Sequence, residues 1–305
     1  MNKFNKRVYG VVGIKSKMAN WNADFSGNPR TTSDGIIFGS DKAFKYPIKK
    51  MWEANTRKVL YVKSYKNEKG EFKARNLLER YKQLFGKDAK EIKDKKEIIK
   101  DLFSLIDVLN FGGTFAEANV SITGAVQIGQ GFNKYEDTSI EIMDILSPFT
   151  NSKKSTDKST SIGKKIVSNE AHYFYPFSVN PENYDIYTNE IDGLEGYTKE
   201  AYDAFKEGCL VAATAYNTNS KAGCENELAI FVECKESSKL YLANLDEYIN
   251  FKKGEEKDII DLSELMQILN KDEVKKEIEK VEIYYNPYTT ELEGDLAIAD
   301  VKDLF

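Results

Sequence analysis

The apolar residues of this chain occur only in short runs, and no other feature limits its possible folds as strongly. Even the longest runs, such as Leu228–Val232, are far below the roughly 20 residues of a membrane-spanning helix. Residues 1–10 carry charge but lack the apolar stretch that a secretory signal needs. We therefore expect a soluble, cytoplasmic protein with no membrane partner.

These short runs alternate with helical patterns along the chain. Strands are predicted near 7–15, 59–65, 172–179, 228–234, 239–245 and 281–285. Helices are predicted near 41–55, 74–86, 91–109, 198–216 and 261–270, with Ser40-Asp41 and Thr198 as N-caps of the first and fourth. The chain shows no internal repeat and no coiled-coil heptads. Single strands mixed with helices favour an α+β fold.

The net charge of −5 is distributed unevenly between the two halves of the chain. Residues 1–165 hold 31 Lys and Arg against 19 Asp and Glu, whereas residues 166–305 hold 13 against 30. A chain polarised in this way can meet a phosphate backbone with its basic part, or pair that part with the acidic part of another copy. Composition alone leaves a third interpretation open, namely solvated charge without a partner.

Cysteine and histidine are scarce, and this restricts the possible chemistry. Cys209, Cys224 and Cys234 are odd in number and widely spaced, which argues against a disulfide framework or a zinc knuckle. Any Ser-His-Asp or Cys-His mechanism would need the single histidine, His172. Because His172 lies in an apolar run, we expect a strand residue with a packing or hydrogen-bonding role. No cofactor and no metal are expected.

Two segments have the composition of generic contact surfaces. Residues 110–132 contain repeated glycines, which permit close approach of another backbone, either that of a ligand or that of a neighbouring strand. Residues 147–165 are rich in Lys, Ser and Thr and too polar to join a core. They predict a long projecting hairpin or loop, and a solvated loop without function is the alternative.

Four segments, taken in chain order, resemble the backbone subunits of type I CRISPR Cascade complexes, particularly those of the type I-B branch. The segments are Asn22–Pro29, Ser40–Lys45, Phe111–Ala116 with Ser121–Gln127, and Ser159–Lys165 with Tyr173–Pro181. The resemblance covers about residues 7–55 and 108–220. It departs from the family at Asn28, where the family commonly has an aspartate between the glycine and the proline.

The resemblance implies an α+β fold with an RRM-like (ferredoxin-like) palm over residues 1–305, a helical insertion at 56–110 and a thumb hairpin or loop at 147–168. It also implies that copies of the chain stack along CRISPR RNA (crRNA), beside other Cascade subunits, and present the guide for pairing with target DNA. No catalytic residue is implied. Stacking of guide bases on sheet aromatics, the ordinary RRM mode, is not expected, because those bases must stay free to pair.

The RNA contacts implied by the resemblance are phosphate contacts that ignore base sequence. The expected residues offer a positive charge, an amide donor or a backbone without a side chain: Arg30, Lys42, Lys45, Lys49, Gly124, Gln127, Gln130, Lys153, Lys154, Lys158, Lys164 and Lys165. Lys42, Lys45 and Lys49 fall on one stripe of the predicted helix, at spacings of three and four residues.

Two alternative functions remain open. Related backbone subunits of type III complexes cut target RNA with an acidic loop residue, and Asp24 lies in a comparable position after the first strand. Such a site needs a divalent metal, and one carboxylate is a weak signal for it, so a loop-capping role for Asp24 is the simpler interpretation. The other alternative is a structural protein that assembles through its oppositely charged halves without RNA.

Overall fold

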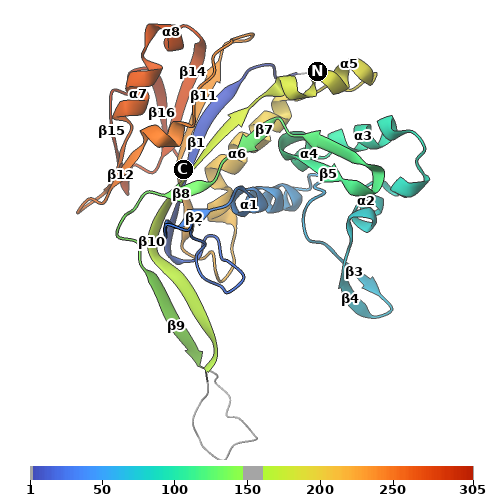
Figure 1. Cartoon of the computed structure of the whole chain (residues 1–305), viewed down its shortest axis with the longest axis horizontal. Helices are drawn as coiled ribbons and strands as arrows, with labels where there is room; N and C mark the ends of the chain where they lie inside the picture. The colour runs from blue at the N-terminus through green and yellow to red at the C-terminus, as the bar shows by residue number, and fades with distance from the viewer. Residues whose placement is uncertain (1–2, 147–160, 305) are drawn as a thin grey trace, which may run out of the picture.

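A central strand, β1 (Val8–Ala19), positions the other layers in the computed structural model, which describes residues 3–146 and 161–304 (Figure 1). It pairs antiparallel with β10 (Ser161–Val179) on one side and with β11 (Cys224–Cys234) on the other. The main sheet has the order β16-β14-β11-β1-β10-β8-β2, and β7 and β9 also pair with β10. Its other strands are β2 (Phe38–Gly39), β7 (Val126–Ile128), β8 (Gly131–Asn133), β9 (Ile140–Leu146), β14 (Ile278–Tyr285) and β16 (Ala299–Asp303).

Two helices cover one face of this sheet. They are α1 (Asp41–Ala54) and α6 (Lys199–Ala215), and they begin at the two predicted caps, Ser40 and Thr198. In each case the capping hydroxyl accepts the backbone N–H three residues later, which satisfies a donor that has no partner within the helix. The buried residues of α1 include Phe44, Ile48 and Trp52, which join the larger of two hydrophobic cores. Both helix starts are therefore confirmed.

An insertion between α1 and β7 packs against the same core. It consists of a hairpin, β3 (Tyr65–Glu68) with β4 (Glu71–Ala74), then α2 (Leu77–Phe85), α3 (Lys95–Phe103), α4 (Ile106–Phe111), and the pair β5 (Gly112–Phe115) and β6 (Val120–Thr123). The helix predicted over 91–109 is divided, because α3 ends at Phe103 and α4 starts at Ile106. The strand predicted at 59–65 is wrong. There the N–H groups of Leu60 and Tyr61 donate to the carboxylate of Asp107 instead of to a strand.

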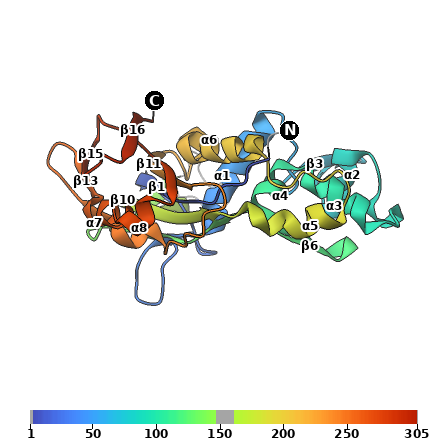
Figure 2. The same ribbon diagram turned by 90° about the horizontal axis from the view of Figure 1, so that it is seen from above.

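The C-terminal residues build a second layer on the opposite face of the sheet (Figure 2). A small sheet of β12 (Asn250–Lys252), β13 (Asp258–Asp261) and β15 (Thr290–Glu293) lies there with α7 (Ser263–Leu269) and α8 (Asp272–Lys275). The strand predicted at 239–245 is wrong, since this segment has no strand pairing and ends in a 3₁₀ turn at Leu245–Tyr248. The strand predicted at 281–285 is confirmed within β14, although β15 and β16 follow it.

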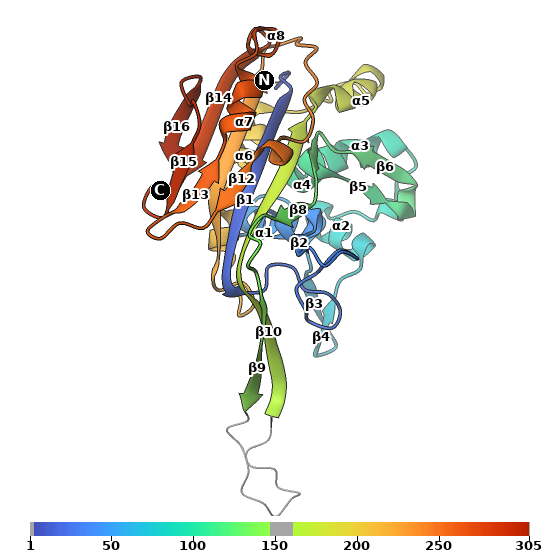
Figure 3. The same cartoon turned by 60° about the vertical axis from the view of Figure 1, so that its left-hand side comes forward.

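A two-stranded ribbon projects from the body (Figures 1 and 3). It consists of β9 and the Ser161–Ser168 part of β10, which pair antiparallel, and every residue of β9 is exposed. The projecting element thus begins near 140, earlier than the 147 expected from composition. Residues 147–160 lie outside the described residues. Within the described part of the chain, no helix is long and apolar enough to cross a membrane.

Candidate nucleic-acid interface

The predicted basic stripe of α1 lies on one side of the helix. Lys42 is exposed, whereas Lys45 is largely covered. The ammonium of Lys45 lies 3.0 Å from Oδ2 of Asp41 and 5.3 Å from the ring centroid of Phe111. The positive charges of Lys45 and Lys42 both lower the pKa of Lys49, so the three ammonium groups lie within electrostatic range of one another. The structure therefore brings this part of the predicted set together.

Lys49 differs from its two neighbours because its ammonium group is partly desolvated. Burial is the largest cause of its lowered pKa, and the charge of the buried Asp107 only partly offsets it. No salt bridge or side-chain hydrogen bond joins Lys49 to any residue that the structure describes. A cation whose lost hydration is only partly offset by nearby carboxylates is a strong attachment point for an anion, since binding adds a charge partner in direct contact.

A loop over residues 20–39 joins the start of α1 to the base of the ribbon. The amide of Asn20 donates to the carbonyls of Gly27, at 2.9 Å, and Ile166, at 3.1 Å. Further along the loop, Oδ1 of Asn22 accepts the N–H of Ser40 at 2.6 Å. The half-buried Arg30 lies on this loop, and its Nε is buried without a hydrogen-bond partner among the described residues. The backbone of Arg30 bonds to Asn22 and Phe38, so Arg30 lies in the part of the loop that leads into α1.

Asp24 closes the tip of this loop. One of its carboxylate oxygens, Oδ1, accepts the N–H of Ser26 at 2.8 Å and of Asn28 at 2.9 Å, and its carbonyl accepts the N–H of Gly27. These contacts are those of a residue that caps a loop. Among the described residues, Asp24 is not part of any group of three or more side chains that could hold a metal ion. The geometry therefore favours the capping interpretation over the catalytic one.

The ribbon lysines point to two different sides. Lys164 is exposed and lies opposite Asp144, and Lys165 is half-buried and lies opposite Met143. Successive residues of a strand face opposite sides of the sheet, so the two ammonium groups do not share a face. Lys153, Lys154 and Lys158 lie outside the described residues.

In the glycine-rich segment over residues 110–132, the backbone that lies close to the glycines belongs to this chain. Gly124 is buried, and a Cβ there would lie 2.2 Å from the carbonyl carbon of Phe111 and 2.4 Å from the nitrogen of Gly112. Its carbonyl oxygen already accepts two amide bonds, from Gln127 at 2.9 Å and from Asn183 at 3.0 Å. At Gly124 the close approach is therefore to the chain's own backbone, and contact between Gly124 and RNA stays a prediction.

The amide residues of the predicted set lie apart from the lysines of the ribbon. Gln127 is exposed and pairs with Ser178, at the far end of β10 from Lys165. At about 3.3 Å per residue, these two positions on β10 are separated by roughly 40 Å. Gln130 is exposed in the turn between β7 and β8. The three lysines of α1 thus lie together and the two ribbon lysines lie on opposite faces, while Gln130 directly precedes Gly131, which pairs with Gly39 two residues before the start of α1.

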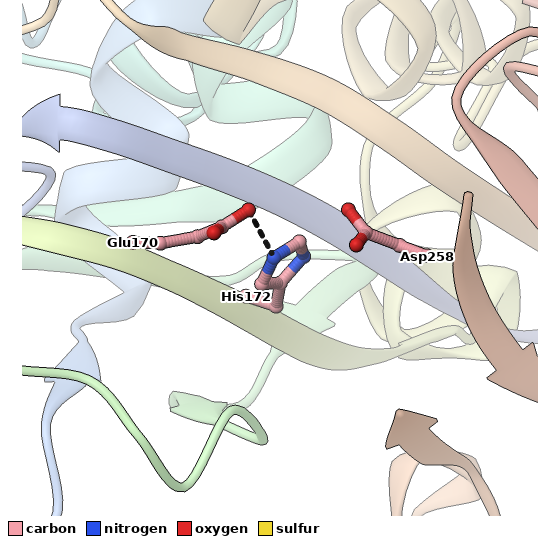
Figure 4. Close-up of side chains that lie close together, drawn as sticks. All are labelled: Glu170, His172 and Asp258. Carbon is pink, nitrogen blue, oxygen red and sulfur yellow. Dashed lines mark hydrogen bonds and ion pairs between the residues drawn. The ribbon is translucent and has the colours of Figure 1, made fainter. Parts of the chain in front are cut away.

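Sequence reasoning missed a buried charged cluster beneath the C-terminal layer (Figure 4). Glu170 and His172 lie two residues apart on β10, and Asp258 reaches them from β13. Ligand atoms of these three side chains lie within 4.8 Å of one another. Nε2 of His172 lies 3.4 Å from Glu170, and Nδ1 lies 2.8 Å from Oε2 of Glu227 on β11. The Glu-x-His spacing on one strand was the signal available in the sequence. The third residue, Asp258, is far from these two along the chain, so no local pattern connects them.

Two lysines already occupy the position that a metal ion would take in this cluster. The ammonium of Lys253 lies 2.8 Å from both Glu170 and Asp258, and that of Lys15 lies 2.8 Å from Asp258. Burial opposes protonation of His172, but the charge of Glu227 and hydrogen bonds to Glu170 and Glu227 outweigh it and raise its pKa to about 9. A protonated imidazole cannot bind a metal. The cluster is therefore an ion-pair clamp between the main sheet and β13, and the predicted hydrogen-bonding role of His172 is confirmed.

Comparisons with known proteins identify one family and two similar solved structures. A family model described as "CRISPR-associated protein Cas7" matches residues 6–284. A chain of the solved "CRISPR RNA-guided surveillance complex, pre-nicking" is similar in fold, with 15% identity and a TM-score of 0.59 over 97% of this chain and 96% of that chain. A chain of a "CRISPR RNA-guided surveillance complex" has 14% identity and a TM-score of 0.49 over 96% and 94%. No curated protein sequence matches the chain.

The clamp predicts a pH-dependent stability. Because the pKa of His172 rises from its ordinary 6.5 to about 9, its contribution is fully present below pH 6.5 and is lost as the pH rises through about 9. The free energy of unfolding, measured in urea from pH 6 to 10, should be higher for the wild type than for His172→Gln at pH 6. This gap should shrink by roughly 3 kcal/mol across the range. Burial lowers the pKa of Lys221 to about 8, so this group also titrates in the range, but it does so in both proteins and its contribution cancels in the difference between them. A gap independent of pH would contradict the assignment.

Proposed function

The chain belongs to the CRISPR-associated protein Cas7 family, and from that premise we propose that it is a backbone subunit of a type I CRISPR Cascade complex. In this role it binds crRNA through phosphates, stacks with further copies of itself beside other Cascade subunits, and leaves the guide bases free to pair with target DNA. The four sequence segments that resemble type I-B subunits make I-B the proposed subtype.

The sheet topology supports an RRM-like palm. In chain order the elements β1, α1, β8, β10, α6 and β11 follow one another, and in space the strands lie in the order β11-β1-β10-β8. This is the βαββαβ arrangement of the ferredoxin-like fold. We assign the insertion at 56–110 and the ribbon as additions to this palm, the ribbon being the thumb. The C-terminal layer is a further addition, on the helix-free face.

This layer also explains why the usual RRM binding mode does not apply. An RRM stacks bases on aromatic side chains of its helix-free sheet face. Here that face is covered, and Tyr9 and Phe174, which lie on it, are buried in the second core with Val11 and Ile230. A guide RNA must therefore use other surfaces, which agrees with a protein that leaves the bases unread.

The observation that carries the proposal is Lys49. Its ammonium is partly desolvated, lacks an ion-pair partner among the described residues, and lies within range of the positive charges of Lys45 and Lys42. This arrangement costs stability in the isolated chain, and a bound phosphate would offset that cost. Phosphates are present on every guide, so such a contact suits a subunit that must accept any RNA sequence.

The ribbon supports association with further copies. The apolar side chains of β9 are exposed, with Ile142 at 59% and Leu146 at 64%. Contiguous exposed apolar side chains on a projecting element are typical of a protein contact. Neighbouring copies are the partners that the family membership provides, and a stack of copies would also bring the separated lysine and glutamine groups near one strand of RNA.

The α1 stripe predicts a sequence-independent contribution to RNA binding. Changing Lys42, Lys45 and Lys49 together to alanine should weaken binding to all single-stranded RNAs alike. The slope of log K against log salt concentration is negative, and each lost phosphate contact makes it shallower by about 0.7. The loss of three contacts therefore makes it shallower by roughly 2. Fluorescence anisotropy at several salt concentrations measures both effects. The matched control changes the exposed Lys90, Lys93 and Lys95 to alanine, which removes the same charge. A loss confined to particular sequences would refute the stripe.

Lys49→Met should change RNA binding and stability in opposite directions. Because burial lowers the pKa of Lys49, its charged form destabilises the folded chain at neutral pH, and this effect fades as the pH rises toward 10.5. Without RNA, the variant should therefore melt at a higher temperature than the wild type, while its affinity for RNA falls. Lys42→Met serves as the control, since this exposed residue should lose affinity without gaining stability. If Lys49→Met melts lower, the ammonium has a partner that stabilises it.

We infer that the subunit is not a nuclease, and Asp24 tests this. Incubation of the assembled complex with complementary RNA and magnesium should leave the RNA intact, because the carboxylate of Asp24 caps its own loop. Gel electrophoresis of labelled RNA provides the measurement. Cleavage at regular intervals that disappears in Asp24→Ala would replace the proposed role with a type III-like one.

A further inference from the structure

The β3–β4 hairpin exposes a pair of stacked aromatic rings. Tyr65 and Phe72 have ring centroids 4.7 Å apart and planes within 14° of parallel. Tyr65 pairs with Ala74 and Phe72 with Asn67, so both rings stand on the same face of the hairpin. They are 41% and 75% exposed. Two large aromatic side chains in water on a projecting hairpin are unusual enough to require an explanation.

The charges around the rings favour an anionic, planar partner. Between residues 63 and 75 the chain has five basic and two acidic residues. On the opposite face of the hairpin, Lys66 and Lys73 are neutralised by Glu68, Glu71 and Glu79.

The other three cations of the hairpin, Lys63, Lys69 and Arg75, form no salt bridge with any described residue. The ammonium of Lys63 lies 5.2 Å from the ring centroid of Tyr65, and Arg75 donates a hydrogen bond to the carbonyl of Tyr65. Two of these three unpaired cations, Lys63 and Arg75, therefore lie against Tyr65.

We propose that this aromatic face is a stacking platform for unpaired bases of a single-stranded nucleic acid. Aromatic rings interleaved with unpaired cations bind such strands, since every base has a π-face and every nucleotide a phosphate. The helix that follows the hairpin, α2, is joined to α1, because Nη2 of Arg80 lies 2.9 Å from Oε1 of Glu53 on α1. The hairpin also projects to the same side of the molecule as the ribbon (Figures 1 and 3).

The proposal rests on the proposed function in one respect, namely that a nucleic-acid strand runs along α1. Two sources supply a strand with this chemistry: a guide RNA held by α1 whose bases are not yet paired, or single-stranded DNA whose bases are not paired with the guide. The competing explanation is that the rings only hold the hairpin together, as cross-strand aromatic pairs do. Stacking with a base, measured directly, separates the two explanations.

The test uses the full chain and single strands of about 12 nucleotides that carry 2-aminopurine, one strand of RNA and one of DNA. Base stacking on an aromatic ring quenches the fluorescence of 2-aminopurine. The double variant Tyr65→Leu and Phe72→Leu keeps apolar side chains on the hairpin but removes both π-faces. It should bind the preferred strand roughly tenfold more weakly and lose the quenching, whereas Tyr65→Phe should retain both. The preferred strand identifies the source.

Tyr288→Leu is the matched control, because Tyr288 is 78% exposed but lies in the acidic C-terminal layer. It should bind and quench like the wild type. Equal affinity and equal quenching in the Leu double variant would overturn the stacking platform, for RNA and DNA alike. The affinity of the α1 triple variant is measured in the same assay. It tests the proposed phosphate contacts, whereas the Leu double variant tests the stacking platform, so each proposal can fail independently of the other.

Discussion

The pairing of β1 between β10 and β11 is the constraint on which the rest of the molecule depends. Its side chains alternate between two cores, with Val12 and Ile14 on the side of α1 and α6, and Tyr9 and Val11 on the side of the C-terminal layer. Both faces of the sheet are thus used for packing. What remains for a partner lies outside the sheet faces, on α1, the loop over 20–39, the ribbon and the β3–β4 hairpin.

The same sheet separates two kinds of buried charge. Under the C-terminal layer, Lys15, Lys253 and a protonated His172 balance the charges of Glu170, Asp258 and Glu227 and join two layers, although the buried Oε1 of Glu227 has no hydrogen-bond partner among the described residues. On α1, by contrast, Lys49 is partly buried without such a partner among the described residues. Charges that balance one another hold two layers together, whereas a cation without an ion-pair partner is a cost that a ligand can offset, and this difference is the reason for our proposal that RNA binds on the side of α1.

Local signals in the sequence predicted the elements whose causes are local. Ser40 and Thr198 cap their helices through N–H groups three residues away, and both starts were found. Val59–Val62 has the composition of a strand but is held by Asp107, which lies 46 and 47 residues from its two backbone partners. No pattern of neighbouring residues contains that contact. The α1 stripe was found because helical spacing places Lys42, Lys45 and Lys49 together, but their different burial was not visible.

The α+β class, the positions of α1 and α6, the lysine stripe and the resemblance to one family could all be predicted before the fold was known, because periodicity, capping residues and motifs are read from neighbours in the chain. Three further properties became visible in the folded chain alone: which lysines lack an ion-pair partner, that Gly124 faces its own backbone, and that Tyr65 and Phe72 share a face. These properties depend on what packs against a residue. Burial and partners come from segments far away in the sequence, and they set both the charge state and the accessibility of each side chain.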